Sequence, residues 1–216
     1  MIYEKYYVWS ILLRLYHWCL VISVVALVVT GFYIHSPWTL TTLEGTGLYP
    51  VLAMRNIHGL AAYLFTAAIL TRIFLLLFGN RHERITDMLP VTSRNLRNMS
   101  TTFCSYGYLR DCHDDERLGH NVMAGMIYIL TMIVALFQVA SGFYLRLPEN
   151  TFWQKWGIIL FSSQQHARYI HHLLMWYFII FALVHIYLVI WNDLTNEDGI
   201  TSSIFTGNKF RPRGIK

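Results

Sequence analysis

Residues 168–192 are RYIHHLLMWYFIIFALVHIYLVIWN, an apolar run long enough to cross a lipid bilayer. The run carries His171 and His185, which are fourteen residues apart. At about 100° per residue this spacing falls about 40° short of four turns, so both imidazoles leave the same helix face. A rise of about 21 Å places one ring near each membrane surface. Because imidazoles in lipid are costly unless something binds them, this stripe predicts two metal centres at two depths.

The composition is that of an integral membrane protein. Hydrophobic residues make up 55% of the 216 residues and charged residues 13%, a balance that is unusual for a soluble domain of this size. Apolar runs of membrane-spanning length cover about 11–34, 52–78, 121–146 and 168–191. We therefore predict an all-α, integral membrane four-helix bundle over residues 1–195. A polar, loosely ordered cytoplasmic tail is expected over residues 196–216.

The net charge of +5 comes from basic residues whose distribution indicates the membrane topology. Lysines and arginines gather before the first run, in the connection 79–120 and at the end of the chain, whereas the other two connections hold few. By the positive-inside rule, both termini and the 79–120 segment lie in the cytoplasm. The expected surroundings are therefore membrane lipid, and nucleic acid is not an expected partner.

Two further histidines match the first two by depth. His17 comes early in the first run, level with His185 near the cytoplasm, and His58 begins the second run, level with His171 near the outside. Each pair joins two helices, as axial ligation of a haem between helices requires. Zinc is disfavoured because each level offers only two good ligands. Irons that carry two imidazoles have no open position, so such haems would pass electrons across the membrane.

Arginines accompany these histidines. Arg14, Arg55 and Arg168 each lie three residues before one of them, on the same helix face and toward the membrane surface. Haem propionates aimed at the interface would meet these guanidinium groups. Arg72 lies at the level of His185 and is expected to serve that haem. Snorkelling to the interface would explain any single arginine, but the repeated pattern favours haem.

The first and third apolar runs close on similar sequences. The first ends in VTGFY (29–33) and the third in ASGFY (140–144), which predicts related packing at the two positions. Gly31 lies on the His17 face, fourteen residues further on. Because glycine has no side chain, a flat and wide group can lie against the backbone there.

Two other features are expected at the outer interface. His172 points about 100° away from His171, so we assign it to the interface or to a propionate contact, and not to iron. The segment FWQKWGIILF (152–161) is amphipathic and is predicted to lie along the outer membrane surface.

At these residues the chain resembles the cytochrome b subunit of membrane-bound nickel–iron hydrogenases, which is related to the b-type subunit of formate dehydrogenase. The resemblance covers roughly residues 8–200 and rests on four motifs. These are RLYHW with VTG in the first run, RNIHG in the second, GHN before the third and HHLLMWYFIIFALVH in the fourth. It implies four helices that hold two b haems, with His17, His58, His171 and His185 as axial ligands.

The resemblance also implies a role in hydrogen oxidation at the bacterial inner membrane. In that family the subunit anchors a periplasmic hydrogenase, made of an iron–sulfur small subunit and a nickel–iron large subunit. It passes electrons to a quinone, menaquinone or ubiquinone, near the cytoplasmic haem, and has no hydrogen-activating site of its own. Asn121 and His120, at the start of the third run, are carried over as quinone contacts.

Two alternatives remain open from the sequence. The same scaffold would serve a formate dehydrogenase or another periplasmic oxidoreductase equally well. A histidine-based ion transporter or metal sensor is the alternative from a different class. It predicts no haem spectrum, and it leaves the outward arginines unexplained.

Overall fold

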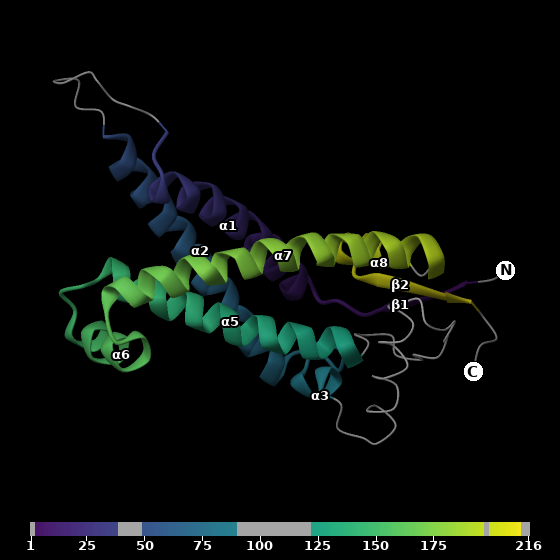
Figure 1. Ribbon diagram of the computed structural model, residues 1–216. Coiled ribbons are helices and arrows are strands. Elements are labelled where there is room, and N and C mark those ends of the chain that lie inside the picture. The colour runs from purple at the N-terminus through teal and green to yellow at the C-terminus, as the bar shows by residue number, and fades with distance from the viewer. Residues whose placement is uncertain (1–2, 39–48, 90–121, 197–198, 213–216) are drawn as a thin grey trace. The chain divides into compact units, whose positions relative to one another are not determined.

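Four long helices dominate the described part of the chain. The computed structural model describes residues 3–38, 49–89, 122–196 and 199–212. Within these residues, four helices are long and apolar enough to cross a membrane. They are α1 (Ile11–His35), α2 (Pro50–Phe78), α5 (Val122–Arg146) and α7 (Gln164–Asn196), as labelled in Figure 1. The four predicted helices are confirmed, and α7 extends beyond its predicted range at both ends.

Local chemistry explains where these helices begin. The Ser10 hydroxyl accepts a hydrogen bond from the Leu13 amide at 3.2 Å and so caps the start of α1. Pro50 opens α2, where its fixed φ suits the first turn and its missing N–H removes no helical bond. Asn150 caps the shorter helix α6 (Thr151–Phe161) by accepting from two amides of its first turn.

The chain forms two compact units, and each is assembled from segments that are distant in sequence. The terminal unit comprises Met1–Leu15, Thr71–Val134 and Leu183–Lys216. The cavity unit comprises Tyr16–Leu70 and Ala135–Ala182. Every long helix contributes one part to each unit, so neither unit is a continuous stretch of the chain.

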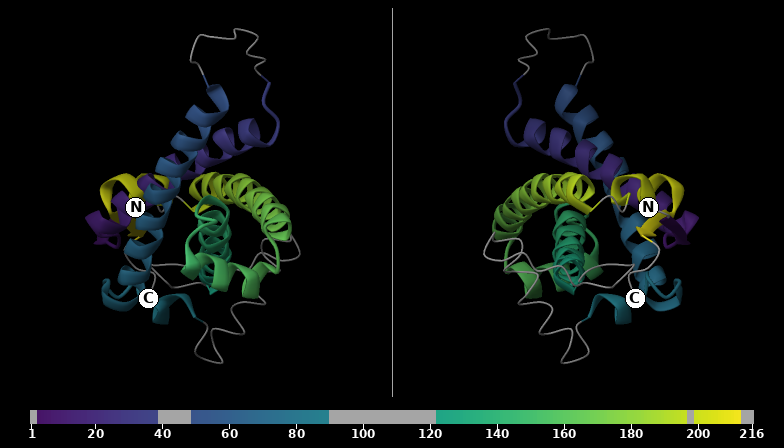
Figure 2. Two further views of the ribbon diagram at one scale, coloured as in Figure 1. Left: turned by 90° about the vertical axis from the view of Figure 1, so that its left-hand side faces the viewer. Right: turned by 90° about the vertical axis from the view of Figure 1, so that its right-hand side faces the viewer.

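In the terminal unit, the two ends of the chain form a small sheet. Strand β1 (Tyr3–Tyr7) pairs antiparallel with β2 (Asn208–Pro212), and helix α8 (Ile200–Thr206) precedes β2. Figure 2 shows the yellow C-terminal segment beside the purple N-terminal strand from two opposite sides. The prediction of a loosely ordered tail is therefore wrong for residues 200–212. A strand partner at the other end of the chain leaves no mark in the local sequence pattern.

Trp9 fixes this C-terminal segment. The indole is 6% exposed, and its N–H donates to the Ser203 hydroxyl at 3.1 Å. The Lys209 ammonium lies 5.6 Å from the centre of the indole ring, in cation–π contact. The Gly207 carbonyl accepts from the amides of Val8 and Trp9 at 2.8 and 3.1 Å. These bonds give the polar tail buried partners and account for its order.

A buried carboxylate joins the start of α1 to the end of α2 in the same unit. Glu83 is 1% exposed, and its two oxygens accept from the amides of Ser10 and Asn80 at 2.8 and 3.2 Å. The Arg72 guanidinium donates to the backbone carbonyl of Glu83 at 3.0 Å. The short helix α3 (Ile85–Met88) follows directly.

In the cavity unit, α6 lies in the connection between α5 and α7. Gly157 of α6 faces the Tyr144 ring so closely that a β-carbon there would overlap the ring. Tyr144, Phe161 and Ala167 form a buried apolar cluster beneath it. The segment 152–161 is thus helical, with Phe152 and several other apolar side chains exposed. Its position along the outer membrane surface stays a prediction.

Candidate cofactor site

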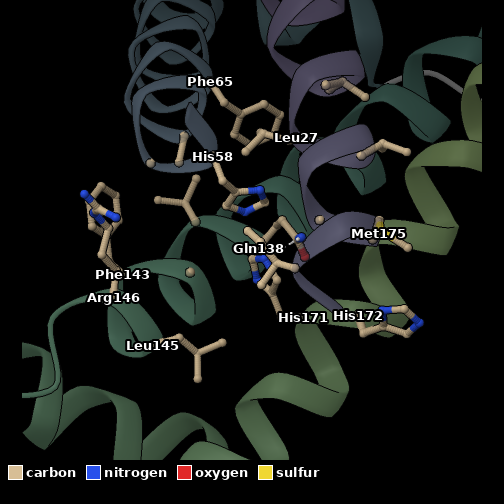
Figure 3. Close-up of a pocket in the computed structure, with 18 of the residues that line it drawn as sticks. Leu27, His58, Phe65, Gln138, Phe143, Leu145, Arg146, His171, His172 and Met175 are labelled. Atoms are coloured by element: carbon tan, nitrogen blue, oxygen red, sulfur yellow. Dashed lines mark hydrogen bonds between the residues drawn. The ribbon is translucent and has the colours of Figure 1, made fainter. Parts of the chain in front are cut away.

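The cavity unit contains a partly open cavity of about 700 Å³ between α1, α2, α5 and α7. His58 from α2 and His171 from α7 both project into it, as Figure 3 shows, and their ring centroids are 6.4 Å apart. The structure therefore brings together the two histidines that were paired by depth at the outer level. Their role as ligands stays a prediction.

Glycines form part of the wall beside each histidine. A β-carbon on Gly31 would lie 3.7 Å from His58 Cε1 and 3.7 Å from Met175 Sδ. A β-carbon on Gly142 would lie 3.3 Å from His171 Cε1, tighter than most such contacts. Side chains at these positions would fill the space next to the imidazoles. The two glycines thus leave space beside the imidazoles, and the flat group expected against Gly31 stays a prediction.

A hydroxyl group lies within hydrogen-bond distance of the Nδ1 nitrogen of each histidine. The Thr30 hydroxyl lies 2.8 Å from His58 Nδ1, and the Ser141 hydroxyl lies 2.8 Å from His171 Nδ1. Gln138 reaches the remaining nitrogen of His171, with its amide nitrogen 3.3 Å from Nε2, as the dashed line in Figure 3 marks. Sequence reasoning missed all three partners, although Thr30 and Ser141 lie in the VTGFY and ASGFY echo.

Three arginines contribute to the cavity wall. Arg55 and Arg168 were predicted from their spacing to His58 and His171, and both line the cavity. Arg146, the last residue of α5, is a third one that the sequence analysis missed because no histidine lies three residues after it. Its guanidinium covers Gly59, where a β-carbon would come within 2.6 Å of Arg146 Cζ. A cluster of three cations suits an anionic group in the cavity.

His172 also lines the cavity, but its side chain does not face the His171 ring. Figure 3 shows the His172 side chain turned away from the His171 ring. It stacks on His35, with ring centroids 4.6 Å apart and planes inclined by 26°, and its Nε2 accepts from the Trp176 indole at 3.3 Å. This arrangement matches the expectation that its ring diverges from that of His171.

The residues predicted for the inner level belong to both units, and each has its own surroundings. His17 meets the Trp18 ring edge-on, with centroids 5.3 Å apart. His185 Nδ1 lies 3.4 Å from the Tyr128 hydroxyl. The Arg14 guanidinium donates to the Phe205 carbonyl.

Arg72, the remaining predicted residue of the inner level, is only 5% exposed and lies in the terminal unit. Besides the Glu83 carbonyl, its guanidinium contacts Met88 Sδ at 3.3 Å. Its predicted contact with a propionate stays a prediction, as does the pairing of His17 with His185. Asn121 and His120 lie outside the described residues.

The donor set in the cavity fits haem. Two imidazoles project into one space, glycines keep the adjoining walls flat, and guanidinium groups can meet two carboxylates. The volume is that of a typical small-molecule pocket. Among the residues that the structure describes, no group of three or more His, Cys, Asp or Glu side chains could hold a metal ion directly. Fold and site together define a helical membrane protein with a haem-sized cavity between its helices.

Comparisons with known proteins also indicate a membrane protein that binds haem. The family model described as "Prokaryotic cytochrome b561" matches residues 8–207. The "Probable Ni/Fe-hydrogenase B-type cytochrome subunit" of Cupriavidus necator is 28% identical, over 93% of this chain and 85% of the relative. The protein of the same name from Azotobacter vinelandii is 29% identical, over 93% and 87%. The "Probable Ni/Fe-hydrogenase 1 B-type cytochrome subunit" of Escherichia coli strain K12 is 25% identical, over 94% and 90%.

The chain belongs to the prokaryotic cytochrome b561 family. It is therefore a b-type cytochrome and a multi-pass membrane protein, and haem b and electron transport follow from the family.

Proposed function

We propose that this cytochrome holds two b haems and anchors a periplasmic nickel–iron hydrogenase, passing electrons from hydrogen oxidation across the inner membrane to quinone. The single observation that supports haem binding is the meeting of His58 and His171 in a glycine-walled cavity, and the second haem is proposed from the matching depths of His17 and His185. The hydrogenase part is supported by the names of the relatives, which match nearly the whole chain.

Each haem would be held by one histidine pair. His58 and His171 would bind the outer iron, and Arg55, Arg146 and Arg168 would meet its propionates. At the inner level, His17 and His185 would bind iron, with Arg14 and Arg72 as propionate contacts. When bound, haem supplies one-electron chemistry at iron. Histidines in both axial positions leave no place for oxygen or substrate, which restricts the site to electron transfer.

Several of the remaining cavity residues are apolar. Phe65 and Phe178 meet edge to face, with ring centroids 5.9 Å apart, and both line the cavity together with Met175. These apolar side chains would pack against the flat faces of a macrocycle, while the three exposed arginines could meet its charged groups. Gln138 donates to the nitrogen of His171 that iron would take, so loading this site requires that hydrogen bond to break.

Partners and topology complete the proposal. The periplasmic side would carry the iron–sulfur small subunit and the nickel–iron large subunit, since this chain is expected to have no hydrogen-activating site. The quinone, menaquinone or ubiquinone, would bind near the inner haem, with Asn121 and His120 as contacts. Both termini would lie in the cytoplasm, as the positive-inside rule predicts.

A reduced-minus-oxidised spectrum, together with the haem-to-protein ratio of the purified protein, tests the proposal. We expect two low-spin b haems per chain. A ratio of one would contradict the dihaem arrangement. No haem, in a well-folded sample expressed with haem available, would favour the ion transporter or metal sensor. The copurifying large subunit distinguishes a hydrogenase from a formate dehydrogenase or another periplasmic oxidoreductase.

The Arg146→Gln variant should lower the midpoint potential of the outer haem. Without the cation, the nearby propionate charge favours ferric over ferrous iron. We expect a shift of about 50 mV, or roughly 1 kcal/mol for one electron, as for a partly screened charge pair. A redox titration measures it, and Lys155→Gln, which removes an exposed cation from α6, is the matched control. An unchanged or raised outer potential in Arg146→Gln would refute the propionate contact.

A further inference from the structure

The Thr30 hydroxyl donates its proton to a backbone carbonyl of its own helix, α1. Thr30 Oγ1 lies 2.6 Å from the Ala26 carbonyl oxygen and 2.8 Å from His58 Nδ1. Two oxygens 2.6 Å apart need a proton between them, and a carbonyl has none to give. The hydroxyl proton therefore points to Ala26, and a lone pair of the hydroxyl oxygen faces the imidazole. His58 must then carry its proton on Nδ1, which leaves Nε2 with a free lone pair.

Ser141 repeats this arrangement on α5. Its hydroxyl donates to the Gln138 carbonyl at 3.0 Å and lies 2.8 Å from His171 Nδ1. Nδ1 is therefore the donor to the hydroxyl oxygen, and Nε2 is an acceptor. The side-chain amide of Gln138 lies 3.3 Å from that Nε2 and supplies a matching N–H donor. Both hydrogen bonds of the His171 ring are therefore consistent with the tautomer that carries its proton on Nδ1.

The two arrangements are alike in sequence and in hydrogen bonding. Thr30 begins TGFY (30–33) on α1, and Ser141 begins SGFY (141–144) on α5. In each case the hydroxyl holds the histidine of a neighbouring helix, and the glycine that follows opens the cavity wall beside that histidine. The echo between the two runs therefore marks a repeated histidine clamp.

We infer that Thr30 and Ser141 are paired positioning residues that lock His58 and His171 in the tautomer that presents Nε2 to iron. This inference rests on the proposed function, in which the two histidines are axial ligands. An imidazole with its proton on Nε2 cannot coordinate through that atom. A partner at Nδ1 also fixes the ring orientation and raises the basicity of the ligand. Loss of such partners typically weakens metal binding by about 10–100-fold.

The Thr30→Val and Ser141→Ala variants of the holoprotein test the inference. We expect the outer haem to dissociate about 10–100-fold faster into an excess of apomyoglobin. Its midpoint potential should also rise, because a less basic imidazole stabilises ferric iron less. Thr30→Ser keeps the hydroxyl and should restore both values. A purely packing role would not produce the shift in potential or its rescue by serine.

Thr66→Val is the matched control. Thr66 lines the same cavity, and its hydroxyl donates to the Ala62 carbonyl at 2.7 Å, so valine changes it as it changes Thr30. The inference is overturned if Thr30→Val and Ser141→Ala release haem no faster than Thr66→Val. If Thr30→Val does not fold, Ser141→Ala, which removes one oxygen atom, decides alone. An outer haem absent from the wild-type protein would instead refute the proposed function.

Discussion

Replacing His171 by alanine is expected to remove one of the two proposed haems and leave the other in place. The His171 ring shares its cavity with His58, so its loss would leave the proposed outer iron with one protein ligand. His58→Ala should have the same effect for the same reason. The haem-to-protein ratio should fall from two to one, and one component should vanish from a redox titration. Quinone reduction with hydrogen should cease, because electrons could no longer enter the inner haem.

His172→Ala is the matched control for this prediction. The residue is adjacent in sequence and has the same side chain, but Figure 3 shows it turned away from the His171 ring, and it stacks on His35. Both haems should remain in this variant. Two haems retained in His171→Ala or in His58→Ala would defeat the pairing of these histidines.

Replacing Glu83 by alanine is expected to destabilise the terminal unit. The buried carboxylate accepts from the amides of Ser10 and Asn80, and alanine leaves both donors unsatisfied. Hydrogen bonds to charged groups contribute about 1.5–3 kcal/mol each. We therefore expect the free energy of unfolding to fall by about 3–5 kcal/mol. Denaturant titration in detergent, followed by circular dichroism, measures this change.

Glu4→Ala provides the control for Glu83. Glu4 lies in β1, is exposed, and accepts from the Tyr6 hydroxyl at 2.6 Å. Its replacement should change the free energy of unfolding by about 0.5 kcal/mol or less, as is usual at exposed positions. Equal stabilities of Glu4→Ala and Glu83→Ala would show that the buried carboxylate does not hold the helix ends.

The sequence determined the features that depend on one helix at a time. Apolar length identified the four long helices, because the bilayer sets that length. Helical spacing placed His171 and His185 on one face of α7. Depth alone paired His58 with His171, because side chains of two helices that bind one group between them must lie at one level. Arg55 and Arg168 followed from the same periodicity.

The tertiary structure determined the contacts that depend on the rotation of each helix relative to its neighbours. Periodicity fixes a side chain on its own helix but not the rotation of the next helix. The echo of VTGFY and ASGFY marked Thr30 and Ser141 as related positions, but only the structure showed that they contact the outer histidines and that Arg146 covers Gly59. The pairing of β1 with β2 was hidden for a related reason. Its partners lie at opposite ends of the chain, and backbone hydrogen bonds between strands leave little trace in side-chain identity.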